Sequence, residues 1–402
     1  MKPFNPVRIT SMAGAVALAM GSASLALADD IRVGVLLGFT GPIESLTPDM
    51  AEAAELALEE VSASGALLDG RSIVSVRGDS TCIDAAAATA SAERLVTSDS
   101  VVAIMGADCS GVTIAVTNNV AVPNGIVIVS PSATSPALTT IEDNGLFFRT
   151  APSDARQGEV IAAILANEGV TSVAVTYTNN DYGKGLAASF EGAFQALGGS
   201  VAATVPHEDG KADYSAEVAN LAASGAEHLA VFGYADQGGK GIIQASVDTG
   251  AFENFVIADG MIGDAVIEAL GDAAASTIGT LPGSDAPEAA EYASYAMDNG
   301  RAGDCPFCGN AYDAAALIAL AIQAAGSTDS AAVSSSLLEV ANAPGEAIGP
   351  GDLARGLALL AEGTDIDYVG ATGVELTDVG ESFGSYKQLA IVDGAFETVA
   401  IH

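Results

Sequence analysis

Short apolar runs alternate along the chain with longer amphipathic segments. In the first 150 residues, runs at 31–37, 72–77, 101–105 and 126–130 predict β-strands. Helices are expected between them, from Thr47 with Pro48 at the first helical position to about Gly65, and from Asp84 as cap to about Thr97. The strand runs are largely apolar on both faces, which is typical of a parallel sheet covered by helices on each side.

The same alternation restarts after residues 148–150. A helix is expected over 153–168, and further strands at 173–177, 201–205, 228–232 and 255–258. Another helix should begin at Asp181 as its cap, with one apolar stripe packed on the sheet, formed by Leu186, Phe190, Phe194 and Leu197. We therefore predict an α/β fold with two doubly wound parallel-sheet lobes.

The remainder of the chain, after about Leu281, is richer in helix. A helix is expected over 312–325, followed by a Gly- and Asp-rich stretch at 344–373 with hairpin character. Two closing strands are expected at 387–392 and 396–401, where Asp393-Gly394 predicts a tight hairpin turn.

The N-terminus has the features of a secretory signal peptide. Lys2 and Arg8 precede an uncharged stretch over 9–28 that ends in Ala26-Leu27-Ala28. We expect residues 1–28 to be removed by cleavage after Ala28, which places the mature protein in the periplasm. The alternative is an uncleaved membrane anchor, although the run is barely long enough to span.

Charge excludes some classes of partner. The chain has 402 residues, of which 14 are basic and 51 acidic, and residues 29–402 alone carry a net charge of −39. Binding to nucleic-acid phosphates or to anionic lipid requires a basic surface that so few cations cannot build. We expect no nucleic-acid partner.

Export makes the four cysteines readable as disulfides, for which three pairings are possible. Cys82 and Cys109 each follow a predicted strand and so lie at the same sheet edge, 27 residues apart. Cys305 and Cys308 form the motif C-P-F-C, which is either a thioredoxin-like redox pair or a local structural disulfide. We favour the structural disulfide, because the strand–helix pattern of a thioredoxin fold is missing. No histidine lies near enough to suggest zinc.

Candidate chemistry lies in the loops that follow the strands, where open α/β sheets bind ligands. Loops of the first half, at 106–111 and 130–136, supply hydroxyls, backbone N–H groups and helix N-termini, which suit a carboxylate. Loops of the second half supply Tyr182, Tyr234 and Asp259, and an acid in a closed cleft suits an ammonium group. The two sets together match an α-amino acid.

Each of these residues also has an ordinary structural interpretation. Ser110 and Asp259 are possible helix caps, Ser132 and Thr134 possible turn residues, and the tyrosines possible half-buried aromatics. The ligand-binding interpretation gains weight because all of them fall on the same predicted sheet edge.

No catalytic set is evident. His207, His228 and His402 lie in unrelated contexts, and no nucleophile-elbow, zinc-protease or phosphate-loop motif is present. We expect neither an enzyme nor a cofactor or metal.

The ordered motifs resemble a known family. They are Thr40-Gly41-Pro42, Cys109-Ser110, the serine-rich loop 130–136, Phe148-Arg149-Thr150, the segment 181–185, and Asp259-Gly260. In this order they resemble the periplasmic leucine/isoleucine/valine-binding proteins of ABC importers, which have the type I periplasmic-binding fold. The likeness extends over essentially the whole mature chain.

The resemblance implies roles for individual residues. Ser110 matches the serine that holds the ligand carboxylate, Ser132 matches the position whose backbone carbonyl accepts from the amine, and Thr134 matches the threonine whose hydroxyl and N–H also contact the ligand. Tyr182 and Tyr234 match tyrosines of the closing lobe, Asp259 matches the acid that pairs with the ammonium, and Cys82–Cys109 matches the family disulfide. Leu46 stands where the leucine binders have an aromatic, and Asp259 where they usually have Glu, which leaves the ligand's side chain open.

The resemblance also implies how the lobes are arranged. The N-terminal lobe would comprise 29–150 plus 281–370 and the C-terminal lobe 151–280 plus 376–402, joined by a three-segment hinge near 149–152, 278–283 and 370–376. The predicted function is capture of a small amino acid, branched-chain or otherwise apolar, and its delivery to an ABC permease by a monomeric protein. The alternative is a sensory or regulatory module for an amide, urea or an aromatic acid.

Overall fold

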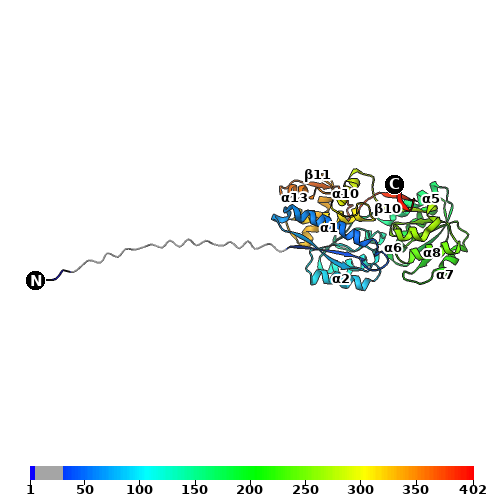
Figure 1. The fold of residues 1–402 in the computed structure, drawn as a ribbon, viewed down its shortest axis with the longest axis horizontal. Coiled ribbons are helices and arrows are strands. Elements are labelled where there is room, and N and C mark those ends of the chain that lie inside the picture. The colour runs from blue at the N-terminus through cyan, green and yellow to red at the C-terminus, as the bar shows by residue number, and fades with distance from the viewer. Residues whose placement is uncertain (5–29) are drawn as a thin grey trace.

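The computed structural model describes residues 1–4 and 30–402. The apolar run of the expected signal peptide and its cleavage site after Ala28 lie outside these residues. Two α/β bodies lie side by side, one with α1, α2 and α13, the other with α5, α6, α7 and α8 (Figure 1).

The first body is built on a five-stranded sheet in the order β2-β1-β3-β4-β5, with every pair parallel. Its strands are β1 (Ile31–Leu37), β2 (Ile73–Asp79), β3 (Ala103–Gly106), β4 (Val127–Ser130) and β5 (Phe147–Arg149). Side chains of β1 alternate between two cores, with Val33 and Val35 in one and Leu36 in the other. Burial on both faces explains why these strands read as continuous apolar runs.

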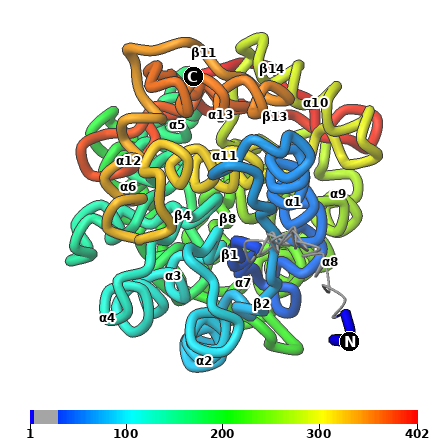
Figure 2. The backbone as a smooth tube through the Cα atoms, turned by 90° about the vertical axis from the view of Figure 1, so that its left-hand side faces the viewer, coloured from blue at the N-terminus to red at the C-terminus, as the bar shows by residue number. Residues whose placement is uncertain are grey.

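Helices cover both faces of this sheet. They are α1 (Thr47–Ser64), α2 (Ala85–Thr97), α3 (Ser110–Val116), α4 (Val122–Asn124), α11 (Cys308–Ala325), α12 (Ser330–Ala341) and α13 (Leu353–Ala361). The yellow helix α11 packs against the blue helix α1, although more than 240 residues separate them (Figure 2). The far end of the chain therefore completes the core that the near end begins.

The second body is built on a seven-stranded sheet in the order β14-β13-β10-β9-β8-β6-β7. Its strands are β6 (Ser172–Thr178), β7 (Ser200–His207), β8 (His228–Phe232), β9 (Asn254–Ile257), β10 (Ile278–Pro282), β13 (Tyr386–Val392) and β14 (Ala395–Ile401). The first five of these strands run parallel to one another. Strand β13 is antiparallel to both of its neighbours, β10 and β14. Positive φ at Asp393 and Gly394 forms the tight turn expected between β13 and β14.

The helices of the second body are α5 (Asp154–Asn167), α6 (Asp181–Ala196), α7 (Ser215–Ala222), α8 (Gly238–Thr249) and α9 (Asp264–Leu270), and α10 (Pro287–Asp298) follows β10.

Two details of α6 differ from expectation. Asn180 is its cap, accepting a hydrogen bond from the Gly183 N–H at 3.1 Å, and Asp181 is the first helical residue. Leu197 lies past the helix end and is 56% exposed, so the buried stripe stops at Phe194.

Two other local predictions are wrong. Leu46, not Thr47, occupies the cap position of α1, and the Thr47 hydroxyl instead donates to the Gly38 carbonyl at 3.0 Å. The stretch 344–373 is not a hairpin, because β11 (Glu346–Ile348) and β12 (Ile366–Tyr368) pair in parallel with α13 between them. Parallel pairing requires such a crossover.

The chain passes between the two sheets beside the end of β5. The Arg149 N–H donates to the Gly380 carbonyl at 2.9 Å, and Thr150 exchanges hydrogen bonds with Asn310 at the start of α11. β10 pairs with β13 as far as Pro282, so the expected lobe boundary at 280–281 falls within this strand.

Membrane-spanning character is limited in the described part of the chain. No single helix there has the length and hydropathy of a membrane span. Helices α11 and α12 have that length and hydropathy only when they are taken together, and they are bent by 110° relative to each other.

Candidate functional site

A small closed cavity lies where the carboxyl ends of the two sheets face each other. Its volume is about 30 Å³, which is room for one or two water molecules. The lining residues come from both bodies and are Ile43, Leu46, Met50, Asp108, Cys109, Ser110, Ser132, Tyr182, Tyr234, Asp259, Gly260 and Phe307. Six of the seven predicted ligand contacts thus meet at one place.

Thr134 is the exception among the predicted contacts, because it does not line the cavity. Its carbonyl accepts the Asp154 N–H at 2.8 Å, and its buried hydroxyl has no hydrogen-bond partner among the described residues. Thr134 therefore lies behind the cavity wall, with a polar atom still unsatisfied.

The serines of the first body occupy distinct roles. The Ser110 hydroxyl accepts the Ser135 N–H at 3.0 Å, which leaves its own hydrogen available to donate. It does not cap α3, because it is the first residue of that helix and Cys109 holds the cap position. The Ser132 hydroxyl donates to the Asp108 carbonyl at 3.0 Å, so this side chain stabilises the loop.

Asp108 is a structural acid. Its carboxylate accepts hydrogen bonds from the Gly38 N–H at 2.5 Å, the Ser80 hydroxyl at 2.8 Å and the Cys109 N–H at 2.9 Å. Burial nevertheless raises its pKa. Since these donors follow three neighbouring strands, Asp108 ties the strand ends of the first sheet together.

Asp259 differs, because it has fewer donors and a second acid behind it. Its carboxylate accepts the Tyr182 hydroxyl at 2.6 Å and the Gly260 N–H at 2.8 Å, and burial raises its pKa to about 6. Asp154 is fully buried, and neither of its oxygens has a hydrogen-bond partner among the described residues. Burial and the charge of Asp259 raise the pKa of Asp154 well above its usual range.

The buried Asp259 carboxylate meets no basic residue in the described cavity lining, and the charge of the neighbouring Asp154 adds to the negative potential there. This favours a cation in the cavity, because a buried charge is stable only when it is paired. Asp259 does not cap α9, which begins five residues later. The sequence did not indicate that Asp154 lies near the site, because an acid in the first turn after a serine cap is an ordinary helix start.

The tyrosines stack on one another. The ring centroids of Tyr182 and Tyr234 are 5.3 Å apart with an interplanar angle of 22°, and both residues are buried. The Tyr234 hydroxyl accepts from the Asn180 amide at 3.2 Å. Tyr182 therefore orients Asp259, while Tyr234 supports Tyr182 from behind.

The remaining wall is apolar and consists of Ile43, Leu46, Met50 and Phe307. Leu46 lies at the start of α1 as expected, whereas Phe307 comes from the C-P-F-C segment and was missed. The only sequence signal was an aromatic residue between two cysteines. Both ends of the cavity are thus defined, one acidic and one apolar.

Two disulfides border the cavity. Cys82 is joined to Cys109 with a Cα–Cα distance of 5.1 Å, and Cys305 to Cys308 with 5.5 Å. Among the described residues there is no free cysteine and no group of acids, histidines or cysteines that could hold a metal ion.

Loops from the two bodies touch across the cavity. The Asp236 carboxylate accepts the Ser45 N–H at 2.9 Å, and the Asp236 N–H donates to the Pro42 carbonyl at 3.0 Å. The Ser135 hydroxyl donates to the Asp181 carbonyl at 3.0 Å. These contacts close the cleft on two sides.

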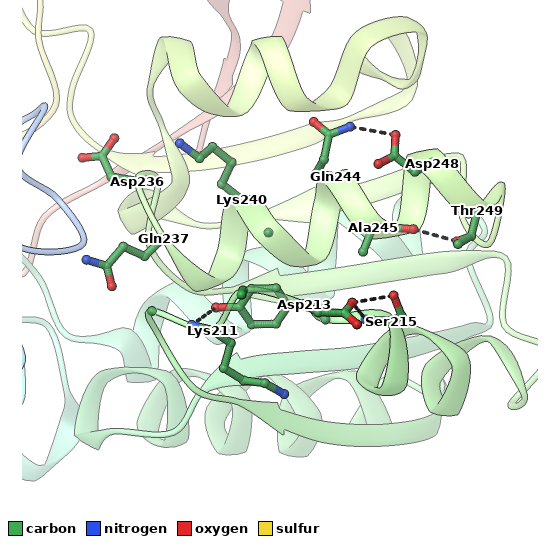
Figure 3. A pocket seen from close by; sticks show the side chains of 14 residues that line it. Lys211, Asp213, Ser215, Asp236, Gln237, Lys240, Gln244, Ala245, Asp248 and Thr249 are labelled. Atoms are coloured by element: carbon green, nitrogen blue, oxygen red, sulfur yellow. Dashed lines mark hydrogen bonds between the residues drawn. The ribbon is translucent and has the colours of Figure 1, made fainter.

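A larger hollow of about 550 Å³ lies elsewhere, between the loop 210–215 and α8 (Figure 3). All of its lining residues belong to the second body, and none is a predicted site residue. Several polar side chains in it bond to one another, as Gln244 does to Asp248 at 2.9 Å. The charged residues of this hollow are exposed or half-buried, whereas Asp259 in the interlobe cavity is buried.

Comparison with known proteins agrees with this architecture. A family model described as periplasmic binding protein matches residues 30–356. The chain belongs to this family. Leu/Ile/Val-binding protein homolog 3 of Brucella melitensis is 31% identical to this periplasmic binding protein over 80% of the chain and 87% of the relative. The substrate-binding protein BasB of a chemotactic signal transduction system in Halobacterium salinarum is 29% identical over 92% of the chain and 88% of the relative.

Solved structures share the fold of this periplasmic binding protein. The leucine-binding protein LivK from Thermotoga maritima superposes with a TM-score of 0.77 at 22% identity, covering 92% of this chain and 98% of that one. LivJ from Streptococcus pneumoniae, in complex with isoleucine, gives 0.75 at 22% identity, covering 93% and 99%. The predicted fold class and the family resemblance are both confirmed.

Proposed function

We propose that this periplasmic binding protein captures an amino acid with an apolar, branched side chain in the interlobe cavity and delivers it to an ABC permease. The observation that carries the proposal is the buried carboxylate of Asp259, which lines the same cavity as Ser110 and the apolar residues around Leu46 and meets no basic side chain among the described residues there. Relatives named for binding leucine, isoleucine and valine support the same ligand class.

Each end of the ligand has partners of suitable chemistry. Asp259, oriented by Tyr182, pairs with the ammonium, and the Ser110 hydroxyl donates to the carboxylate. The Ser132 carbonyl supplies a further contact to the headgroup, and Tyr234 covers it from the second body. Leu46, Ile43 and Met50 surround the aliphatic side chain.

The proposed lobes are 29–150 plus 281–370 and 151–280 plus 376–402, which move about their three connections. A cavity of about 30 Å³ is smaller than an amino acid, so the lobes must separate for ligand to enter, and they then close on it around a wider cavity. The mature protein would act as a monomer in the periplasm after cleavage behind Ala28.

Sensing of a neutral amide, urea or an aromatic acid is not favoured. None of these ligands carries an ammonium group that could pair with the buried Asp259 carboxylate. The BasB relative shows that the family fold also serves signalling, but the acidic wall argues for an amino acid in either role.

Thermal unfolding of the purified protein with each of the twenty amino acids tests the proposal. Leucine, isoleucine or valine at about 100 times its dissociation constant should stabilise the fold by roughly 2.7 kcal/mol. Asp259→Ala should weaken binding by about 3–5 kcal/mol, because the ligand's buried ammonium loses its partner.

Asp213→Ala is the matched control, since this acid belongs to the same body but is exposed. It should bind as the unmodified protein does. Stabilisation by urea or aromatic acids alone, or unchanged binding by Asp259→Ala, would refute the assignment of the headgroup.

A further inference from the structure

The C-P-F-C segment separates the ligand cavity from a second hollow. Phe307 lines the closed interlobe cavity and also a hollow of about 310 Å³ beside α10 and β10. Cys305 faces that second hollow, whereas Cys308 is buried. The phenyl ring is therefore a partition, and its position decides how much room the ligand's side chain has.

The backbone at Phe307 has a conformation that its side chain does not favour by itself. Its φ is 61° and its ψ is 7°, in the left-handed region that residues with a Cβ rarely adopt. It occupies the cap position of α11, and its carbonyl accepts the Ala311 N–H at 2.9 Å. Some constraint must hold this turn against the extended alternatives.

The disulfide supplies that constraint. It keeps the Cα atoms of Cys305 and Cys308 5.5 Å apart, and the Cys308 N–H donates to the Cys305 carbonyl at 3.2 Å. Two residues further on, Asn310 bonds to Thr150 in the crossover between the sheets. The disulfide thus bridges the residues on either side of Phe307, and the hydrogen bonds between Asn310 and Thr150 fix the first turn of α11 to the crossover.

We propose that the Cys305–Cys308 disulfide is a positioning element of the ligand site, which holds Phe307 as the wall of the side-chain pocket. The inference rests on the proposed function and adds a determinant of specificity to it. Without the bridge, the 303–308 segment relaxes into the second hollow and Phe307 withdraws from the cavity. The pocket then becomes larger and fits a branched aliphatic side chain less well.

A double-mutant cycle tests this. Dissociation constants for leucine are measured by calorimetry for the unmodified protein, Cys305→Ser/Cys308→Ser, Phe307→Ala and the triple variant. We expect Cys305→Ser/Cys308→Ser and Phe307→Ala each to bind leucine about tenfold more weakly than the unmodified protein, and the triple variant to bind it no more weakly than Phe307→Ala. The double-cysteine variant and Phe307→Ala should also gain affinity for phenylalanine relative to leucine.

Asp304→Ala is the matched control, because Asp304 is exposed in the same segment; it should bind leucine as the unmodified protein does. Losses that add fully in the triple variant, or a cysteine variant with unchanged leucine affinity, would overturn the positioning role. If the cysteine variant fails to fold, Phe307→Leu takes its place in the selectivity test, and unchanged selectivity is then the contrary result. Absence of leucine binding by the unmodified protein would instead overturn the proposed function, and this inference with it.

Discussion

At the scale of single residues, the site is distinguished by a buried acid that has no basic residue beside it in the cavity lining, as far as the chain is described. Asp259 and Asp154 are both buried, and the nearest buried cation, Arg149, is already paired with Glu381. By contrast Asp108, equally buried, accepts three hydrogen bonds. Asp108 therefore serves the fold, whereas Asp259 faces the cavity without a cationic partner among these lining residues.

The raised pKa of Asp259, about 6, makes ligand binding pH-dependent. An ammonium ligand pairs with the ionised carboxylate, so leucine affinity should fall about tenfold between pH 7.5 and pH 5 as Asp259 takes up a proton. Calorimetry at the two pH values measures this. Equal affinity at both would contradict the pairing.

The ligand-free protein should show the opposite trend. A carboxyl whose pKa is higher in the folded than in the unfolded state stabilises the fold below its usual pKa of about 4. That stability is lost as the pH rises through about 6. Asp259→Asn, which cannot ionise, should therefore raise the melting temperature at pH 7.5 more than at pH 4. Equal effects at the two pH values would indicate that Asp259 does not titrate in this range.

At the scale of elements, Arg149 connects the end of β5 with the loop that carries Ser132 and Thr134. Its guanidinium donates to the carbonyls of Ala133 at 3.0 Å and Ser135 at 2.9 Å, and to the Thr139 hydroxyl at 3.0 Å. The side chain is fully buried and forms an ion pair with Glu381. One residue thus fixes the headgroup loop to the crossover.

Arg149→Met should destabilise the protein by about 3–5 kcal/mol, because it leaves the partly buried Glu381 carboxylate and two carbonyls without their donor. Urea unfolding measures the change. Arg156→Met removes an exposed pair with Glu159 instead, and should alter stability by less than about 0.5 kcal/mol. A loss of similar size in both variants would argue against the connecting role of Arg149.

At the scale of the whole molecule, closure depends on a few polar contacts between loops. Asp236 makes two of them, with Ser45 and with Pro42. Asp236→Ala removes the carboxylate contact without touching the cavity lining, so the open form should gain population.

We expect Asp236→Ala to raise the dissociation constant for leucine about fivefold, mainly through faster release. Stopped-flow dissociation and small-angle scattering of the ligand-free protein measure the rate and the opening. Asp248→Ala, which removes an exposed acid on the same body, should change neither quantity. Slower association with an unchanged release rate would argue against a closure contact.

Most of the fold could be predicted from the chain because its strands are buried on both faces. The strand expected at 31–37 matches β1 to the residue. The errors are local or long-range. A cap is decided by one hydrogen bond, as at Asn180, and the parallel pairing of β11 with β12 depends on where α13 places them.

The candidate site was predictable where strand ends define it, as for Ser110, Tyr182 and Asp259. Residues brought in by packing were not. Phe307 reaches the cavity only because α11 returns to the first sheet, and Thr134 recedes because its carbonyl holds Asp154. The C-P-F-C motif and the serine-rich loop mark these two segments in the sequence, but neither motif says which way its side chains point.

The packing of α11 on α1 also bears on how the protein is made. The ribosome releases β1 to β5 first, but the helix that covers them on one side is encoded some 160 residues after β5 ends. The whole second sheet up to β10 emerges in the interval. A nascent chain therefore presents an apolar, half-covered sheet over this whole interval, and the first body can complete its core only after α11 has emerged.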